Sequence, residues 1–258
     1  MPSSIEIADR PPYLEVMLQH RQGVLALDVI FQITQPCTVL FGASGSGKTS
    51  ILKAIAGLLQ PQRSRILSRS AAHPHLTLSD STRSIFLPPH LRPIRLGTQS
   101  ATLFPHKTVR GNIAYGAQSP TNASPSTTAK LIEDALTCFD LRDRANDLPA
   151  RLSGGQRQRV SLARAVVAAA ALGGDGILLL DEPFTGLGLA ERDRMVLAVT
   201  DFLEPTQTPV LSVTHDIGEA FLLAAEVIRI ADGRVIEQGP VEAVLSAERD
   251  RLLTQLNS

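Results

Sequence analysis

The chain has 258 residues, enough to bury a sizeable core as one large domain or two small ones. Lysine plus arginine and aspartate plus glutamate number 25 each, so the formal net charge is zero. A balanced charge produces no net field that would attract nucleic acid or an anionic membrane, and we therefore expect no nucleic-acid partner.

The sequence predicts neither a secretion signal nor a membrane-spanning helix. Residues 1–10 lack the apolar stretch of a signal peptide. A membrane helix needs roughly 20 apolar residues, whereas the longest candidate, residues 165–172, is too short and is followed by two glycines. The chain contains only two cysteines, Cys37 and Cys138, which favours a reducing compartment without structural disulfides.

Two alternating apolar segments come first in the chain, and a phosphate-binding motif follows them. Residues 14–18 and 28–34 are predicted strands. Residues 42–49 fit the P-loop pattern G-x-x-x-x-G-K-[ST], between the apolar run 38–41 and a segment with helical apolar spacing, 51–59. This strand–loop–helix context favours a P-loop over a Gly/Ser linker that happens to contain Lys-Thr.

The P-loop predicts nucleotide binding. Its glycines let backbone N–H groups and the helix N-terminus face the phosphates. We expect Lys48 to reach the β- and γ-phosphates and the Thr49 hydroxyl to bind Mg²⁺. The predicted nucleotide-binding residues here are Gly42, Ala43, Ser44, Gly45, Ser46, Gly47, Lys48, Thr49 and Ser50.

The middle of the chain is predicted to be helical. After a polar region with short strand candidates, such as 84–87, residues 101–160 contain no strong strand pattern. A loop rich in turn formers, 119–127, precedes an amphipathic helix with Leu131, Leu136 and Phe139 on its apolar face. The sequence Leu-Ser-Gly-Gly-Gln at 152–156 then begins another predicted helix, although Ser-Gly-Gly alone is a common turn sequence.

Two carboxylates follow the apolar strand predicted at residues 177–180. Asp181 is expected to hold Mg²⁺ through its water shell, and Glu182 to polarise the water that attacks the γ-phosphate. The alternatives are a solvated turn after the strand, or metal binding by Asp181 beside an inert Glu182. Pro183 fixes the backbone just beyond the pair.

The remaining segments alternate between helix and strand. This pattern predicts a largely parallel sheet covered by helices. Asp232-Gly233 predicts a hairpin turn. The predicted segments are helix 191–203, strand 210–213, helix 217–224, strand 227–230 and strand 234–238.

Together and in this order, the three motifs resemble those of ATP-binding cassette (ABC) ATPases, over residues 14–245. The resemblance implies an α/β fold: a P-loop NTPase cassette with a RecA-like, mostly parallel sheet core, an N-terminal antiparallel β subdomain and an inserted α-helical subdomain. We expect a single domain over residues 1–258, with a nucleotide-binding core at 14–98 and 165–245, the helical signature subdomain at 101–160 and a C-terminal tail at 246–258.

The resemblance also implies roles at the γ-phosphate. Gln99 matches the glutamine that senses Mg²⁺ and the attacking water, and His215 matches the switch histidine that contacts the γ-phosphate. Elsewhere, a lone loop glutamine is usually solvated and a histidine at a strand end is usually structural. The implied cofactors are ATP and Mg²⁺. The implied catalytic residues are Glu182, His215 and Gln99, and the implied metal-binding residues are Thr49, Gln99 and Asp181.

Residues 152–156 match the signature segment of the family. The resemblance implies that Ser153, Gly154, Gly155 and Gln156 contact the γ-phosphate held by the P-loop of a second copy. One chain cannot easily bring residues 48 and 153 together across the helical subdomain. The expected active unit is therefore a head-to-tail homodimer with two composite sites.

The chain departs from the family pattern at several positions. Gly188 replaces the aspartate that bridges two cassettes, which loosens the loop. No Phe, Tyr or Trp lies between residues 19 and 27 to stack on adenine, and Tyr13 is too close to the start of the first strand. Gly97 stands where bulky strand residues are common, and Ser64 where a turn glycine is usual.

Residues 103–116 resemble bacterial importer ATPases, and Val-Arg-Gly-Asn at 109–112 resembles molybdate-type oxyanion importers. The implied function is ATP hydrolysis that energises a membrane importer. Its transmembrane permease subunits and periplasmic substrate-binding protein are other chains, and the implied location is peripheral, at the cytoplasmic face of the inner membrane. Because only residues 241–258 follow the last predicted hairpin, we expect no C-terminal regulatory β-domain.

Two other functions stay open. A soluble ABC ATPase acting on DNA, RNA or the ribosome tends to carry coiled coils, tandem cassettes or basic extensions, which this sequence lacks. A nucleotide-gated regulator with weak hydrolysis is favoured only by Gly188.

Overall fold

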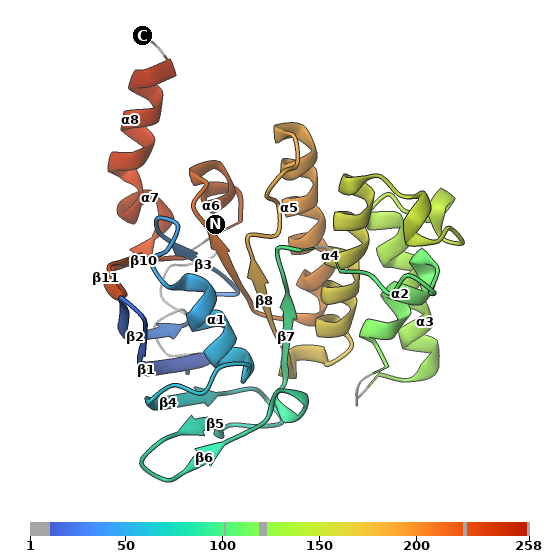
Figure 1. The fold of residues 1–258 in the computed structure, drawn as a ribbon. Helices are drawn as coiled ribbons and strands as arrows, with labels where there is room; N and C mark the ends of the chain where they lie inside the picture. Colours follow the sequence, from blue (N-terminus) through green and yellow to red (C-terminus); the bar gives the residue numbers. More distant parts are fainter. Residues whose placement is uncertain (1–10, 101, 119–122, 224–225, 257–258) are drawn as a thin grey trace, which may run out of the picture.

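The computed structural model describes residues 11–100, 102–118, 123–223 and 226–256. In this part of the chain, 11 strands form one sheet in the order β6-β5-β4-β1-β2-β11-β10-β3-β9-β8-β7 (Figure 1). The strands are β1 (Leu14–Gln22), β2 (Leu25–Ile33), β3 (Cys37–Phe41), β4 (Arg63–Ser68), β5 (Leu76–Asp80), β6 (Ile85–Phe86), β7 (Ile94–Gly97), β8 (Ile177–Asp181), β9 (Val210–Thr214), β10 (Glu226–Ala231) and β11 (Arg234–Pro240).

Strands β10, β3, β9, β8 and β7 pair in parallel and carry the predicted nucleotide-binding core. Helices cover both faces of this half, so its strands are buried on both sides. Along β8, Leu178 and Leu180 pack in one apolar cluster, and Leu179 packs in the other. The helices are α1 (Lys48–Ala56), α2 (Val109–Gly116), α3 (Pro125–Cys138), α4 (Gly154–Ala170), α5 (Leu189–Leu203), α6 (Ile217–Leu223), α7 (Val241–Val244) and α8 (Ser246–Leu256).

Strands β2, β1, β4, β5 and β6 form the antiparallel half, at the bottom of Figure 1. Its inner face buries apolar side chains in the same cluster as those of α1. The first two strands are longer than the sequence predicted. The family usually has a turn glycine at the position of Ser64. In this structure Ser64 lies inside β4, and its hydroxyl is 2.6 Å from the Ser79 hydroxyl.

Helix α1 ends at Ala56, three residues before the end of the predicted apolar segment. Gly57 adopts φ 79° there, and the Leu58 N–H donates to the Lys53 carbonyl. The buried Arg92 side chain donates to the carbonyls of Ala54 and Ile55 at 2.9 and 2.7 Å. These bonds satisfy carbonyls that a helix end would otherwise leave unpaired.

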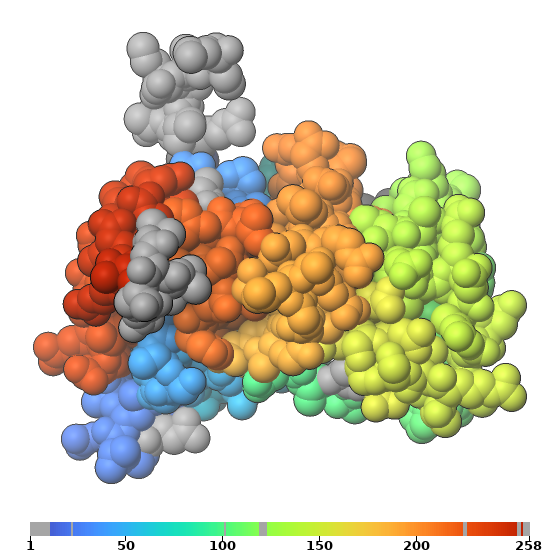
Figure 2. All heavy atoms as spheres, turned by 90° about the horizontal axis from the view of Figure 1, so that it is seen from above, coloured from blue at the N-terminus to red at the C-terminus, as the bar shows by residue number. Residues whose placement is uncertain are grey.

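The predicted helical middle part is confirmed within residues 102–118 and 123–160. Helix α3 begins at Pro125, inside the predicted loop, because Ser124 caps it by accepting a hydrogen bond from the Thr127 N–H. Residues 101 and 119–122 of these predictions lie outside the described residues. From above, the yellow-green helical part lies across the molecule from the red C-terminal segments (Figure 2).

Two glycines lie where the backbone comes so close to a neighbouring strand or helix that a side chain would not fit. A Cβ at Gly97 would lie 2.8 Å from Leu180 Cδ2 and 3.3 Å from Ala165 Cβ, so a bulkier residue would push α4 away from β7. The predicted hairpin at Asp232-Gly233 is confirmed, with φ 47° and 75°. A Cβ at Gly233 would lie 2.1 Å from the Ala26 carbonyl oxygen.

Candidate nucleotide-binding and catalytic site

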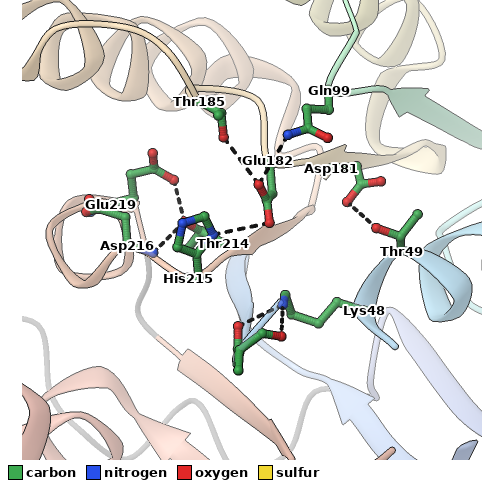
Figure 3. Close-up of polar contacts among 12 residues, drawn as sticks. Lys48, Thr49, Gln99, Asp181, Glu182, Thr185, Thr214, His215, Asp216 and Glu219 are labelled. Carbon is green, nitrogen blue, oxygen red and sulfur yellow. Dashed lines mark hydrogen bonds and ion pairs between the residues drawn. The ribbon is translucent and has the colours of Figure 1, made fainter. Parts of the chain in front are cut away.

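The loop between β3 and α1 is closed around the side chain of Lys48. Gly45 and Gly47 adopt φ 83° and 101°, which favours glycine at both positions. Lys48 Nζ donates to the carbonyls of Gly42 and Ala43 at 2.7 and 2.8 Å (Figure 3). The loop therefore has the turn of a phosphate-binding loop, with the N-terminus of α1 at its end.

Thr49 and Asp181 meet where α1 faces the end of β8. The Thr49 hydroxyl donates to Asp181 Oδ1 at 3.0 Å. Burial lowers the pKa of Lys48, against the attraction of Glu182 and Asp181. Burial disfavours the charged form of Asp181 as well and so raises its pKa, and the Thr49 hydrogen bond opposes this shift. Both charges are therefore disfavoured until an oppositely charged ligand compensates them.

The backbone at Glu182 turns its carboxylate out of the sheet. Its N–H still donates to the Val213 carbonyl at 3.0 Å, which extends the β8–β9 ladder by one residue. Its φ is then 46°, a left-handed conformation that costs a non-glycine residue about 1–3 kcal/mol. Strain of this kind persists where the surroundings determine the conformation, and such positions cluster at functional sites.

Three side chains surround the Glu182 carboxylate, two of them from distant segments and one from its own loop (Figure 3). Gln99 Nε2 donates to Oε2 at 3.4 Å, and the Thr185 hydroxyl donates to the same oxygen at 3.3 Å. His215 Nδ1 lies 3.2 Å from Oε1. The structure thus brings together the three predicted catalytic residues, which are far apart in the sequence.

A hydrogen-bond network among Thr214, Asp216 and Glu219 holds the start of α6, next to His215. This network was not predicted from the sequence. The Thr214 hydroxyl donates to Glu219 at 2.6 Å and accepts from the Asp216 N–H. Asp216 in turn accepts from the Glu219 N–H and from Arg192. Burial raises the pKa of Glu219. The Asp-x-x-Glu spacing at 216–219 is a helix-capping signal that could have revealed this network.

Ser153 and Gln156 form a capping box at the start of α4. The Ser153 hydroxyl accepts from the Gln156 N–H, and Gln156 Oε1 accepts from the Ser153 N–H. Within the described ranges, no hydrogen bond joins residues 153–156 to residues 42–50. One turn further along, Gln158 donates to the carbonyls of Pro183 and Thr185, which ties α4 to the loop after Glu182.

The end of the β1–β2 hairpin lies beside the P-loop. A Cβ at Gly47 would lie 2.2 Å from Leu27 Cδ2 and 3.3 Å from Leu25 Cδ2. His20 pairs with Leu27 in the strand register, on the face of β1 that also carries Leu18. His20 Nδ1 is buried and has no hydrogen-bond partner among the described residues. Only Phe, Tyr and Trp were considered as adenine-stacking residues in this segment, so His20 was not predicted from the sequence.

Gly188 lies in the position that precedes α5, with φ −66° and ψ 153°. Any residue can adopt this conformation, and no atom lies within 4 Å of a Cβ placed there. Neither backbone nor packing in this chain therefore requires glycine at position 188.

Comparisons with known proteins agree with this geometry. The ABC transporter family profile matches residues 30–185. The molybdenum import ATP-binding protein ModC of Rhizobium meliloti is 38% identical over 90% of this chain and 62% of its own length. The molybdate/tungstate import ATP-binding protein WtpC of Archaeoglobus fulgidus is 35% identical over 95% of each chain.

The fold has a solved counterpart in cbiO1 from Clostridium perfringens, part of the ABC transporter complex cbiONQ. The two structures have a TM-score of 0.75 at 23% identity, covering 96% of each chain. This likeness bears on the fold alone. The chain spans about three fifths of the length of the ModC relative from Rhizobium meliloti. In the described part of the chain, no helix is both long and apolar enough to cross a membrane.

Proposed function

The chain belongs to the ABC transporter family, and we propose that it binds and hydrolyses ATP to energise a membrane transporter. One observation carries this proposal: a carboxylate, Glu182, lies among Gln99, Thr185 and His215, near the N-terminus of the P-loop helix. A positioned carboxylate beside a phosphate-binding loop can act as the base for hydrolysis of the phosphoanhydride bond of ATP.

The P-loop holds the triphosphate in this proposal. Residues 42–50 wrap the phosphates, and Lys48 exchanges its two carbonyl partners for phosphate oxygens. The positive charge of Lys48, disfavoured by burial, is then compensated. Gly47 and Leu27 mark the side of the loop where the nucleoside lies, and the His20 imidazole supplies an aromatic surface there.

The residues at the end of β8 fit Mg²⁺. A hydroxyl and a carboxylate oxygen, from Thr49 and Asp181, lie 3.0 Å apart. Mg²⁺ prefers oxygen ligands and usually takes few from the protein, the rest being water and substrate phosphates. The amide oxygen of Gln99 is a further candidate ligand. Bound there, the ion would neutralise phosphate charge that develops during cleavage.

The carboxylate of Glu182 accepts a proton from the attacking water. His215 and Gln99 hold this carboxylate from two sides and so limit its rotation. The Thr214–Asp216–Glu219 network keeps His215 at the start of α6. Loss of a positioned base of this kind typically costs a factor of about 10² to 10⁴ in rate.

The signature residues act on a second copy of the chain. Ser153, Gly154, Gly155 and Gln156 begin α4, whose N-terminal N–H groups favour an anion. Because no hydrogen bond links them to the P-loop of their own described chain, we assign their anion to the P-loop of a partner in a head-to-tail homodimer. The proposed division is a core at 14–98 and 165–245 with the helical subdomain at 101–160, although α4 continues unbroken across residues 160–165.

The names of the relatives support a finer proposal. Both are import ATP-binding proteins, for molybdenum and for molybdate or tungstate. We assign this chain to a bacterial importer of molybdate or a related oxyanion, with transmembrane permease subunits and a periplasmic substrate-binding protein as partners. Its place is then the cytoplasmic face of the membrane.

A nucleotide-gated regulator with weak hydrolysis is the second candidate, and Gly188 is the observation that favours it. The experiment is release of inorganic phosphate from Mg·ATP by the purified chain, with Lys48→Ala as the control. We expect phosphate release by the parent and loss of ATP binding in the variant, because the phosphates lose their P-loop cation. ATP binding without phosphate release supports the regulator. Unchanged ATP affinity in Lys48→Ala contradicts the phosphate site itself.

A further inference from the structure

The outer face of the antiparallel half is hollowed into a groove of about 680 Å³. It lies on strands β2, β1, β4 and β5, on the side away from the apolar cluster that packs on α1. One face of such a sheet is normally solvated and featureless. A hollow of this size is within the range of ligand-binding sites, about 300–1,000 Å³.

Three arginines line this groove, and none of them forms an ion pair in the described part of the chain. Arg63 and Arg65 extend from β4, and Arg83 from the turn after β5, and all three are exposed. In the described part of the chain, no carboxylate lies within 4.0 Å of their guanidinium groups. Guanidinium groups bind carboxylates and phosphates through two parallel hydrogen bonds.

Two carboxylates, Asp28 and Asp80, also line the groove. Asp28 accepts a hydrogen bond from Gln19 at 3.1 Å and keeps its charge. The hydrogen bond from Thr82 at 2.7 Å and the nearby charge of Arg83 lower the pKa of Asp80, so Asp80 and Arg83 compensate each other. The uncompensated positive charge is at Arg63 and Arg65, and this part of the groove is complementary to an anion.

The spacing along β4 identifies the shape of that anion. Arg63, Arg65 and Leu67 alternate along the strand and share its outer face. Their side chains therefore lie about 6.6 Å apart, which is also the spacing of alternate side chains in an extended peptide. Across the neighbouring strands from Arg65, the exposed side chains of Met17 and Ile30 add an apolar surface to the groove.

We infer that this groove binds an extended acidic segment of a partner protein, with the pattern acidic-x-acidic-x-apolar. The two carboxylates face Arg63 and Arg65, and the apolar side chain lies over Leu67. The site is separate from the P-loop residues and does not depend on the proposed ATP hydrolysis.

The test uses two labelled peptides of identical composition and the whole chain, with fluorescence anisotropy as the readout. One peptide is Ser-Thr-Glu-Thr-Glu-Thr-Leu-Thr-Ser, and the other, Ser-Thr-Glu-Glu-Thr-Thr-Leu-Thr-Ser, places its carboxylates on opposite sides of an extended chain. We expect the first to bind at least about tenfold more tightly. Its affinity should fall as salt rises from about 0.05 to 0.5 M, because the contacts are ionic.

Charge reversal provides the second arm. Arg63→Glu with Arg65→Glu should lose binding of the first peptide, whereas Arg194→Glu with Arg251→Glu should keep it. Arg63→Gln with Arg65→Gln replaces the first pair if charge reversal prevents folding, as judged by thermal melting. Equal binding of the two peptides, no binding below about 1 mM, binding that survives both Arg63/Arg65 variants, or displacement by equimolar inorganic phosphate would each overturn the inference.

Discussion

At the scale of single residues, the site depends on backbone conformations that side-chain patterns do not reveal. Glu182 leaves the strand at φ 46° while its N–H stays bonded to β9. This geometry aims one carboxylate at Gln99 and His215 together. In an ordinary strand conformation, Glu182 would project from the face of the sheet opposite to that of Asp181.

His20 is expected to be the surface on which the adenine stacks. His20→Ala should weaken ATP binding by about 2- to 13-fold, because an aromatic stack contributes about 0.5–1.5 kcal/mol beyond area burial. His20→Trp should bind ATP at least as tightly as the parent. Binding of inorganic tripolyphosphate, which has no adenine, should be unchanged in both variants.

Equilibrium titration of ATP and tripolyphosphate checks this prediction, with the exposed neighbour Arg21→Ala as the control. An equal loss of affinity for both ligands in His20→Ala would mean that the histidine acts on the P-loop by packing. The adenine assignment would then be wrong.

At the scale of elements, Arg92 joins the P-loop helix to the antiparallel strands. Its guanidinium donates to Ala54 and Ile55 at the end of α1, to Leu78 in β5 and to Leu87. The side chain is 1% exposed and has only carbonyl partners among the described residues, so burial lowers its pKa to about 10. Its aromatic neighbour, Phe86, lies 4.9 Å from the guanidinium carbon.

Arg92→Met should destabilise the chain by about 2–4 kcal/mol, because four carbonyls lose their donor in a buried place. Urea unfolding measures this free energy. The exposed Arg194→Met is the control and should change stability by less than about 0.5 kcal/mol. A loss of the same small size in Arg92→Met would show that water replaces the guanidinium.

The elements also show what the sequence could and could not predict. The P-loop, the acidic strand and the Asp-Gly hairpin were predicted because each has a local signal, and the structure confirms all three. The outer strands differ from one another in this respect. β6 lies inside the strand candidate at 84–87, whereas β5, which contains Thr, Ser and Asp, was not named from the sequence. Its buried contact with β4 joins the hydroxyls of Ser64 and Ser79, which are 15 residues apart and share no local pattern.

The same distinction applies to the site. The sequence motifs predicted Lys48, Asp181 and Glu182, and the family pattern predicted Gln99 and His215; the structure brings Glu182, Gln99 and His215 together, and their roles stay predictions. No local pattern indicates Gln158, which donates to a carbonyl 25 residues away. Arg92 was missed for the same reason, since its partners lie in α1, in β5 and in the loop after β6.

At the scale of the whole molecule, the proposed reaction uses the starts of two different helices. The P-loop begins α1, and the signature residues begin α4. Helix N-termini favour anions, and in the described ranges no hydrogen bond joins the two segments. In the proposed head-to-tail dimer, each P-loop faces the partner's signature.

A mixture of two inactive variants tests this arrangement. Lys48→Ala removes the P-loop cation, and Ser153→Arg fills the signature with a bulky side chain. Each homodimer should be inactive, whereas the heterodimer should regain one intact site and a measurable ATPase rate. If mass measurement shows the heterodimer and no activity returns, the composite site is contradicted.

The most direct test of the account is the separation of ATP binding from hydrolysis in Glu182→Gln. The variant keeps the size of the side chain and its contacts with Gln99 and His215 but removes the base. We predict parental ATP affinity, a hydrolysis rate lower by about 10²-fold or more, and accumulation of an ATP-bound dimer. The matched control, the exposed Glu204→Gln, should behave as the parent. Hydrolysis by Glu182→Gln at the parental rate would contradict the assignment of Glu182 as the base.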